Sequence, residues 1–509
     1  MLEPVREPLL RRALRGRALR NVSGTQSVDP LEQFEASELG DLVELVQRAE
    51  GQGTTVRAVG SRHSWSDVAL GGGYVLRPRR LSGELPLDHV RQGVDTQWLL
   101  RVQGGTPIRS VNELLDSRGL ALANMGGYDG QTFAGVMSTA THGTGVAYGP
   151  LASFARSIDL VAAGGTVHRI EPENGITDAT AYRSAHPDRV IEQNDELFAA
   201  VVVGIGLLGV VYSVTIAAVA AFRLCERRVL REWRDVRPDL ADPGHLDGFD
   251  HYELYLSPYG DGDDNPCMVC TRTPTDEAPP WWSKRTRRSL SPEILALVPG
   301  IGRLLNVAAG LAPRAVPRLI RMTLNALTDD EYINKSYRVF NIGRANHVPA
   351  YSAEIGVPVD ERGHHIEAID RILAIADRHA RLGDVYQTSP LALRFVAPSD
   401  APMAMMHGRR TMMIELIMLK RTQGGIELIA DYENALYELE GRPHWGQINT
   451  LTAGRIRELY PGLDAWLQVH DRLNASGVFD SAFSKRVGIR LADRNPAPAP
   501  SAEPASPGT

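Results

Sequence analysis

His63 and the small-residue loop around it are the part of the sequence that most directly indicates chemistry. Residues 60–66 read GSRHSWS and follow a short apolar run. Residues 131–145 read QTFAGVMSTATHGTG, rich in Gly, Ala, Ser and Thr and without a charged residue. Small residues let the backbone approach a large, flat ligand and leave amide N–H groups free to bind oxygens. Two such loops, each after a short strand, predict a dinucleotide held by backbone amides.

A second chemical signal is a carboxylate inside an apolar stretch. Residues 412–418 read MMIELIM, in which Glu415 is the single charged residue. A buried carboxylate is costly unless a partner neutralises it, and Arg394 in SPLALRFV is the natural partner. The pattern predicts a buried strand that carries one functional charge, with a purely structural ion pair as the alternative.

Two further patterns have the spacing of cofactor sites but the wrong context. Gly204, Gly206 and Gly209 spell GxGxxG, yet the dinucleotide fingerprint follows a strand and opens a helix. Here the preceding residues are typical of a helix end and the following ones of a strand. Cys267 and Cys270 form CxxC in a strand-like segment with no second pair. We therefore predict no Rossmann NAD site and no metal site.

Five segments in order resemble the aldonolactone oxidase and alditol oxidase branch of the vanillyl-alcohol-oxidase flavoproteins, which carry a PCMH-type FAD-binding domain. The segments are GSRHSWS, NMGGYDGQTFAGVMSTATHGTG, VVVGIGLLGVV, GRPHWGQ and GVFDSAFSKR. Together they cover most of the chain, from about residue 21 to residue 490. The resemblance implies an FAD-dependent oxidase that transfers a hydride from an alcohol carbon to flavin N5, with O₂ reduced to H₂O₂.

By this resemblance FAD is the cofactor, and His63 is bonded covalently to its 8α-methyl group. A neutral imidazole is a nucleophile near neutral pH, which suits this bond; a histidine that only hydrogen-bonds the cofactor is the alternative. The two loops then hold the pyrophosphate, and residues 204–211 wrap the adenine side. His142 is expected to be structural or to lie near phosphate rather than to act as a base. The other expected cofactor-binding residues are Gly60, Ser61, Arg62, Ser64, Gly126, Ser138, Thr141, His142, Gly143, Thr144, Gly145, Gly209 and Val210.

Gly126 bears on the electron acceptor. In the family a small residue at this position leaves room for O₂ beside the flavin, whereas alanine marks the dehydrogenases. Gly126 therefore favours an oxidase, and a plain tight turn is the alternative.

The expected catalytic pocket departs from the family pattern at two positions. The relatives carry a glutamate two residues before the arginine and a lysine after HWG, but Ala392 and Gln447 stand there in this chain. Arg394 matches the arginine. Glu415 is expected to supply the carboxylate from the neighbouring strand, with His444 as the alternative base. Because the usual glutamate and lysine are missing, we expect a less polar pocket that suits a less polar alcohol.

The order of elements must bring these distant residues together. Strands are predicted over residues 55–59, 74–76 and 98–103, with helices capped by Ser37 and Thr106. This β–α–β rhythm continues to about residue 216. Beyond it, strands are predicted over 251–256, 268–272, 337–342 and 412–418, and a helix over 364–382.

These elements predict an α+β chain of two domains. We place an FAD-binding domain at residues 1–222 and a cap domain at 223–458, for which the resemblance implies a large antiparallel sheet. Residues 459–492 are expected to return to the FAD-binding domain, and the Pro-, Ala- and Ser-rich residues 493–509 to form a disordered tail.

Composition narrows the class of protein and its surroundings. The chain has 509 residues, 43% hydrophobic and 23% charged, with a net charge of −6, which gives no general attraction to nucleic acid. Three cysteines are too few for a disulfide framework, so a cytoplasmic location is expected. No run reaches the roughly 18 apolar residues of a membrane span. Residues 294–327 are apolar but interrupted by arginines, which favours cap helices and leaves peripheral membrane contact open.

Three functions remain open from the sequence. The first is an oxidase of a small-molecule alcohol, namely a sugar lactone, a polyol or a less polar alcohol, with O₂ as acceptor. The second is a dehydrogenase of the same fold that passes electrons to a quinone or a protein. The third is a flavin-binding protein with little alcohol-oxidising activity, which the missing glutamate and lysine would explain.

Overall fold

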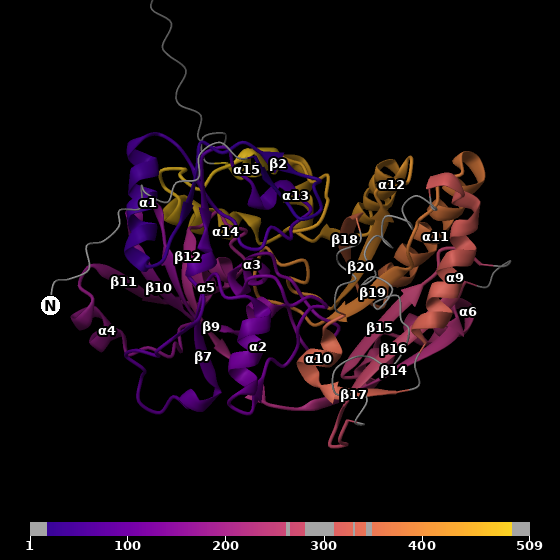
Figure 1. Ribbon diagram of the computed structural model, residues 1–509, viewed down its shortest axis with the longest axis horizontal. Helices are drawn as coiled ribbons and strands as arrows, with labels where there is room; N and C mark the ends of the chain where they lie inside the picture. The colour runs from indigo at the N-terminus through magenta and orange to yellow at the C-terminus, as the bar shows by residue number, and fades with distance from the viewer. Residues whose placement is uncertain (1–17, 261–264, 280–309, 329–330, 343–348, 491–509) are drawn as a thin grey trace, which may run out of the picture.

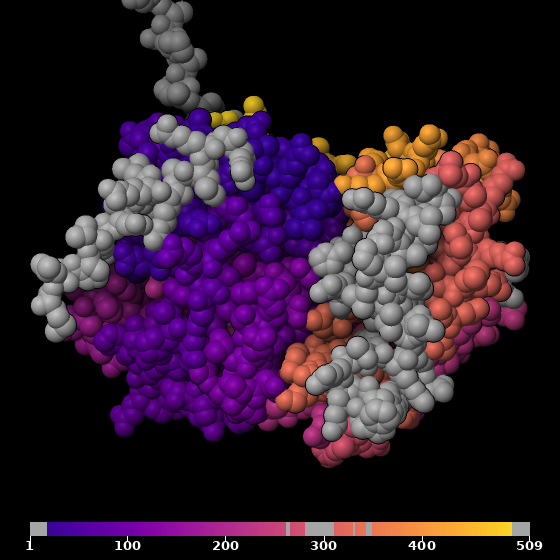
Figure 2. Space-filling view, in the orientation of Figure 1, coloured from indigo at the N-terminus to yellow at the C-terminus, as the bar shows by residue number. Residues whose placement is uncertain are grey.

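The computed structural model describes residues 18–260, 265–279, 310–328, 331–342 and 349–490. Two halves, which share no sheet, lie side by side (Figure 1). Figure 2 shows the same division on the surface, with the N-terminal half in indigo and purple and the cap half mainly in orange and salmon. The predicted tail and residues 294–309 of the apolar stretch lie outside the described residues.

The N-terminal half combines a small parallel sheet with a larger mixed sheet. The parallel sheet has the order β3–β5–β4, and the larger one the order β11–β10–β9–β12–β7–β6. The helix α1 packs its buried Leu42, Leu45 and Val46 against the small sheet and the edge of the larger one. Its strands and helices are β1 (Leu19–Arg20), β2 (Ser27–Val28), β3 (Glu32–Glu35), α1 (Leu39–Gly51), β4 (Val56–Ala58), β5 (Tyr74–Arg77), β6 (Glu84–Leu85), β7 (Leu99–Gln103), α2 (Ile108–Asp116), β8 (Leu120–Ala121), α3 (Phe133–Ser138), β9 (Ala155–Val161), β10 (Val167–Glu171), α4 (Ala179–Ala185), β11 (Arg189–Gln193), α5 (Asp195–Val202), β12 (Val210–Ala217) and β13 (Val219–Ala220).

The cap half is one antiparallel sheet of eight strands, in the order β17–β14–β16–β15–β19–β20–β18–β21. Its elements are β14 (Arg223–Glu232), α6 (Trp233–Ala241), β15 (His251–Leu256), β16 (Pro266–Thr275), α9 (Val316–Leu327), β17 (Tyr332–Lys335), α10 (Ser336–Phe340), β18 (Ala350–Pro358), α11 (His364–Gly383), β19 (Leu391–Val396), β20 (Thr411–Leu419), α12 (Gly425–Tyr437) and β21 (Arg442–Pro443).

The two faces of the cap sheet differ in character. Side chains alternate along a strand, so Leu254 and Ile414 point to the face that α6, α11 and α12 cover, in one apolar cluster. Glu253 and Glu415 are their neighbours in sequence and point to the other face, toward the N-terminal half. The alternation thus separates a packed core from a polar surface within single strands.

The C-terminal segment packs back on the N-terminal half. It consists of the helices α13 (Ala453–Leu459), α14 (Leu463–Leu473) and α15 (Ala482–Arg486). Arg486 pairs with Asp67 at 2.7 Å, and the Trp466 indole donates to the carbonyl of Ala200. These contacts place it near the loop of residues 60–66. The boundary at residues 222 and 223 stays a prediction, although β12 and β14 on either side of it belong to different sheets.

Three local predictions are wrong. Residues 337–342 were expected as a strand, but Ser336–Phe340 is the helix α10, whose buried Ser336, Val339 and Phe340 have helical spacing. Helix α2 has Pro107 at its N-cap, because the Thr106 hydroxyl accepts from the Gly83 amide instead. Helix α1 is capped by Glu38 rather than by Ser37.

The helix predictions over the apolar stretch are tested only in part. Helix α9 buries Val316, Ile320 and Leu324 against the cap sheet, while Leu319 and Met322 are exposed. In the part of the chain that the structure describes, we find no helix with the length and apolar character needed to cross a bilayer.

Candidate active site and cofactor cavity

Two cavities meet between the halves. The first opens over about 1050 Å³ and is lined by residues 57–65, 131–141, 205–211 and 444–447. The second opens over about 1000 Å³ between residues 125–144 and the polar face of the cap sheet. The long first cavity has the lining expected of a dinucleotide site, and the second has the charged lining of a small-molecule site.

Close backbone approach shapes the first cavity. A Cβ atom at Gly209, whose φ is +147°, would lie 2.6 Å from the Val161 carbonyl oxygen. Arg62, Ala140 and Ile205 adopt positive φ values although they carry side chains. Such strained backbone persists where the surroundings demand it and is common at ligand sites.

Free polar groups in the first cavity fit the expected cofactor. Among the described residues, the amides of Ser61 and Ser64 donate no hydrogen bond to backbone or side chain. Amides held toward a cavity suit phosphate oxygens. The buried Gln447 Oε1 likewise has no partner among the described residues. An FAD molecule would satisfy groups that the chain itself leaves unpaired.

The predicted cofactor residues divide between the cavities. Those that line the first cavity are Gly60, Ser61, Arg62, His63, Ser64, Ser138, Thr141, Gly209 and Val210. Those that line the second are His63, Gly126, Thr141, His142, Gly143 and Thr144. Gly145 lines neither; it bridges to His251 at the cap sheet. One continuous site therefore gathers nearly all of these residues.

His63 lies where the cavities join. It lines both, as do Trp65, Gln131, Thr141, His444 and Gln447. Its ring stacks on Tyr128, with centroids 4.5 Å apart, and meets Trp65 edge-on at 4.9 Å. Two aromatic contacts thus hold the imidazole ring beside both cavities.

Arg394 is the centre of the charged wall of the second cavity. Register places Glu253 directly opposite Arg394, and Ala392 and Glu354 directly opposite Glu415. The Arg394 guanidinium pairs with Glu253 at 2.9 Å, Glu354 at 3.2 Å and Glu415 at 2.8 Å. The predicted pairing of Arg394 with Glu415 is confirmed, and the Glu415 carboxylate reaches Arg394 from the strand next to that of Ala392.

The charged row continues across the sheet to the cofactor loop. Arg272 pairs with Glu253 at 3.0 Å and with Glu226 at 2.8 Å, and it donates to the Thr144 hydroxyl at 2.9 Å. The expectation of a less polar pocket is therefore wrong. Carboxylates on several strands of the cap sheet, far apart in the sequence, make the cavity strongly polar.

The surroundings of Glu415 and Glu354 shift the pKa values of these two carboxylates in opposite directions. Burial raises the pKa of Glu415, and Arg394 only partly opposes this effect. Burial would also raise the pKa of Glu354, but His142, His444 and Arg394 lower it to about 2. Neighbouring carboxylates with opposite shifts are typical of acid–base sites. These surroundings favour the ionised form of Glu354 and the protonated form of Glu415.

His444 presents a donor to the cavity. Its Nδ1 accepts the Gly446 amide at 3.0 Å, which leaves the ring proton on Nε2, 3.4 Å from the Thr141 hydroxyl. Burial lowers the pKa of His444 to about 4, so the ring is neutral near pH 7. A neutral ring with its lone pair already engaged is poorly placed to act as a base.

The two cysteines of the CxxC pattern lie in the cap sheet and are not residues that line the two cavities. Cys267 and Cys270 are free and buried in β16, and burial raises the pKa of each thiol to about 12, which makes them unreactive.

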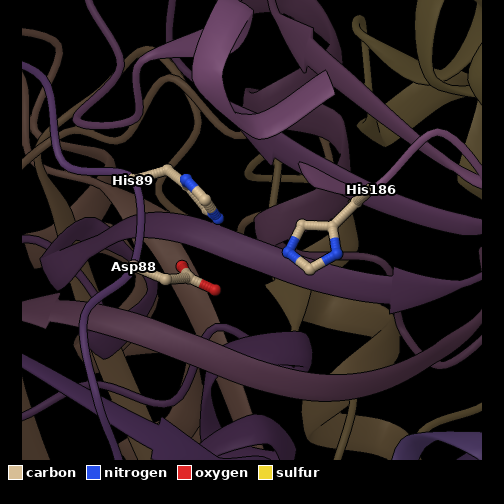
Figure 3. Close-up of side chains that lie close together, drawn as sticks. All are labelled: Asp88, His89 and His186. Carbon is tan, nitrogen blue, oxygen red and sulfur yellow. The ribbon is translucent and has the colours of Figure 1, made fainter. Parts of the chain in front are cut away.

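Asp88, His89 and His186 lie close together (Figure 3), with their candidate ligand atoms within 4.8 Å of one another. However, Asp88 already pairs with Arg169 at 2.6 Å and with Arg101 at 3.0 Å. Two guanidinium groups beside the carboxylate oppose a bound cation, so we assign no metal to this cluster.

Sequence reasoning missed Glu253, Glu354 and Arg272. Glu253 and Glu354 are charged residues within largely apolar strands, the same signal that identified Glu415, whereas Arg272 lies between two threonines and gives no such signal. Glu253 in HYELYL and Glu354 in YSAEIGV could have been found in this way. Their meeting at Arg394 depends on strand order, which local patterns do not give.

The chain matches known families over most of its length. Residues 214–487 match the D-arabinono-1,4-lactone oxidase family, and residues 33–171 match an FAD binding domain. It is 29% identical to the L-gulono-1,4-lactone dehydrogenase of Mycobacterium tuberculosis over 92% of this chain and 98% of that protein. It is 25% identical to the L-gulonolactone oxidase of Scyliorhinus torazame, over 91% and 96% of the two chains. It is 26% identical to the alditol oxidase of a Streptomyces species, over 92% and 98%.

Solved structures support the same fold. The cholesterol oxidase of B. sterolicum superposes with a TM-score of 0.74 at 14% sequence identity, over 96% of this chain and 99% of that one. At this identity the likeness concerns the arrangement of the two halves and not the substrate.

Proposed function

Because this chain belongs to the D-arabinono-1,4-lactone oxidase family, we propose that it oxidises a carbinol group of a sugar lactone or polyol, with O₂ as the electron acceptor. The protein is an FAD-dependent oxidoreductase that acts on CH–OH groups. We propose a neutral, hydroxyl-rich substrate because of the second cavity. Its carboxylates can accept hydrogen bonds from several substrate hydroxyls, and its guanidinium groups can donate hydrogen bonds to them.

One observation carries the proposal. The Arg394–Glu415 pair lines a polar cavity that is continuous, at His63, with the cofactor cavity. A substrate hydroxyl bound by the Arg394–Glu415 ion pair would therefore share one continuous space with the part of the cofactor next to His63.

The protein residues divide the work of the reaction. Bound FAD supplies the hydride acceptor. Glu415 takes the proton of the substrate hydroxyl, because its raised pKa favours the protonated product state. Arg394, held by three carboxylates, stabilises negative charge that develops on the substrate oxygen. His444 holds its Nε2 proton toward the Thr141 hydroxyl, and Gln447 offers an amide oxygen that has no partner among the described residues.

His63 is proposed as the covalent flavin ligand. Its place at the junction and its two aromatic contacts support this role. Gly126 supports O₂ as acceptor, because a Cβ there would lie only 3.2 Å from the His142 carbonyl oxygen and would narrow the second cavity. The relatives bear both oxidase and dehydrogenase names, so a dehydrogenase that uses a quinone or protein acceptor is the second candidate.

The charged cavity argues against a flavin-binding protein without alcohol chemistry. Such a protein would have no reason to hold three carboxylates around one arginine beside the cofactor, since buried charges are costly. The three free cysteines agree with the proposed cytoplasmic location. The exposed Leu319 and Met322 on α9 are the described residues that would support peripheral membrane contact.

The experiment is a turnover screen of FAD-loaded protein with sugar lactones, polyols and simple alcohols, in which O₂ consumption, H₂O₂ formation and reduction of an artificial acceptor are measured together. One H₂O₂ per substrate oxidised is the expected result. Turnover only with the artificial acceptor would select the dehydrogenase, and no turnover with any acceptor would reject both.

A further inference from the structure

Arg57 is a buried cation that the proposed reaction does not use. It lies on β4, is 3% exposed, and is one of the residues that line the first cavity. Its guanidinium group donates to four backbone carbonyl oxygens, which belong to Val68 at 3.0 Å, Ile205 at 2.9 Å, Gly206 and Phe479. All four are neutral groups, so these hydrogen bonds engage the donors without balancing the charge.

The carboxylates around Arg57 do not balance this charge either. Among the described residues none forms an ion pair with it. Asp67 and Asp480 act on it from farther away, but Asp67 pairs with Arg486 at 2.7 Å and Asp480 accepts from Asn474 at 3.2 Å. Burial lowers the pKa of Arg57 to about 10, and the two carboxylates only partly oppose this effect. A buried charge without a close partner is costly.

The turn that Arg57 holds lines the same cavity and offers open donors. The peptide bonds of the described residues are trans, and in a trans peptide the N–H points away from the carbonyl. Because the Ile205 carbonyl points to Arg57, the Gly206 amide points away from it. In this part of the described chain, the amides of Gly206 and Gly209 donate no hydrogen bond to backbone or side chain, and both glycines line the first cavity. Open amides in front of a buried cation are suited to an anion.

We propose that the diphosphate of FAD is the anion that balances the buried charge of Arg57. The FAD binding domain includes this residue, and the diphosphate is the anionic part of the cofactor. Arg57 acts through its charge and through the turn, because its own N–H groups already donate to carbonyls. It is therefore a positioning residue. The inference rests on FAD as the cofactor, and not on the substrate or the electron acceptor of the proposed function.

The test is the dissociation constant of FAD in the His63→Ala background, in which no bond at residue 63 can hold the cofactor. Flavin fluorescence is followed while FAD is added to the apoprotein. Arg57→Gln removes the charge and keeps an amide donor, whereas Arg57→Lys keeps the charge with fewer hydrogen bonds. Arg57→Gln is expected to weaken FAD binding at least about tenfold, because charge interactions are strong where water is excluded. Arg57→Lys is expected to stay within about threefold of the parent.

Arg442 offers a matched control. It is 5% exposed and also donates to backbone carbonyl oxygens, those of Leu459 at 2.7 Å, His407 at 2.9 Å and Met405 at 3.3 Å. It is not among the residues that line either cavity. Arg442→Gln should therefore lower the temperature of thermal unfolding, as Arg57→Gln should, but leave the dissociation constant of FAD within about threefold of the parent.

A competition experiment tests the diphosphate without a change at residue 57. ADP-ribose carries the diphosphate and adenosine lacks it, and each is used to displace FAD from the His63→Ala protein. ADP-ribose should do so at a concentration at least about tenfold lower than adenosine. This measurement decides the question if Arg57→Gln does not fold.

Several results would overturn the inference. Unchanged FAD affinity in folded Arg57→Gln would mean that the charge is not used. Equal losses in Arg57→Gln and Arg57→Lys would assign the effect to the hydrogen bonds of the turn, and an equal loss in Arg442→Gln would assign it to general destabilisation. Displacement of FAD by both competitors alike, or by neither, would mean that the diphosphate is not recognised. Because no substrate is present, a failed turnover screen would reject the proposed function and leave this result intact.

Discussion

Glu415→Gln tests the proposed base while preserving the shape of the site. The amide oxygen of glutamine can still accept from Arg394, 2.8 Å away in the wild type, so the change removes mainly the charge and the proton affinity. A positioned general base contributes about 10²- to 10⁴-fold in rate. We expect kcat/KM to fall by about that factor, with flavin content unchanged.

The chain offers a matched rescue. Ala392 lies directly opposite Glu415 on the neighbouring strand, on the same face of the sheet. Opposite residues in such a pair have Cβ atoms about 5 Å apart, so a carboxylate from residue 392 reaches the same region. Ala392→Glu in the Glu415→Gln background is expected to recover at least about tenfold of the lost kcat/KM. Ala392→Gln in that background has nearly the same shape without the charge and serves as the control.

The pH profile gives an independent reading of the same group. The base must be ionised to work, and burial raises the pKa of Glu415. The wild-type kcat/KM is therefore expected to fall on acidification from a pH above the usual glutamate range, and this acid limb should be missing from the residual activity of Glu415→Gln. Glu415→Gln activity within threefold of wild type, or equal rescue by Ala392→Glu and Ala392→Gln, would refute the assignment.

Three further predictions concern the cofactor, the acceptor and the fold. His63→Ala should leave the yellow colour in the supernatant after acid precipitation, whereas the wild-type pellet stays yellow; equal release from both proteins would refute a covalent link. Gly126→Ala should slow reoxidation of the reduced flavin by O₂ at least about tenfold without changing the rate of anaerobic flavin reduction; stopped-flow absorbance measures both rates. An unchanged reoxidation rate would contradict the proposal that Gly126 leaves room for O₂. Arg101 and Arg169 lower the pKa of the buried Asp159 to about 2, so this carboxylate stabilises the fold above its unfolded pKa of 3.8 by about 2 kcal/mol and loses that contribution as the pH falls through about 2. Asp159→Asn should therefore lower the free energy of unfolding at neutral pH by a few kcal/mol, and so the denaturant midpoint. Its free energy of unfolding should also change less than that of the wild type between neutral and acidic pH. Denaturant midpoints equal to those of the wild type at neutral and at acidic pH would contradict this.

The cofactor half was largely predictable because its signals are local. Glycine loops and short apolar strands constrain the backbone within a few residues, so His63 and neighbours that line the first cavity could be named from the sequence, and their role toward FAD stays a prediction. The element order predicted around residues 204–209, a helix before the turn and a strand after it, is confirmed by α5 and β12.

The substrate cavity was predicted only in part because it depends on strand order. Glu415 and Arg394 were paired correctly, but the sequence does not say that Glu253 and Glu354 lie on strands next to theirs. The polarity of the cavity was therefore underestimated. The error at Ser336–Phe340 has a different cause, since the stretch is short and its buried residues have helical spacing.

Anaerobic mixing of the FAD-loaded protein with substrate tests the central claim most directly, because it isolates hydride transfer from the choice of acceptor. Sugar lactones and polyols should bleach the flavin within the turnover time, and Glu415→Gln should do so about 10² to 10⁴ times more slowly. A wild-type flavin that dithionite reduces but that no lactone, polyol or simple alcohol bleaches would contradict the account.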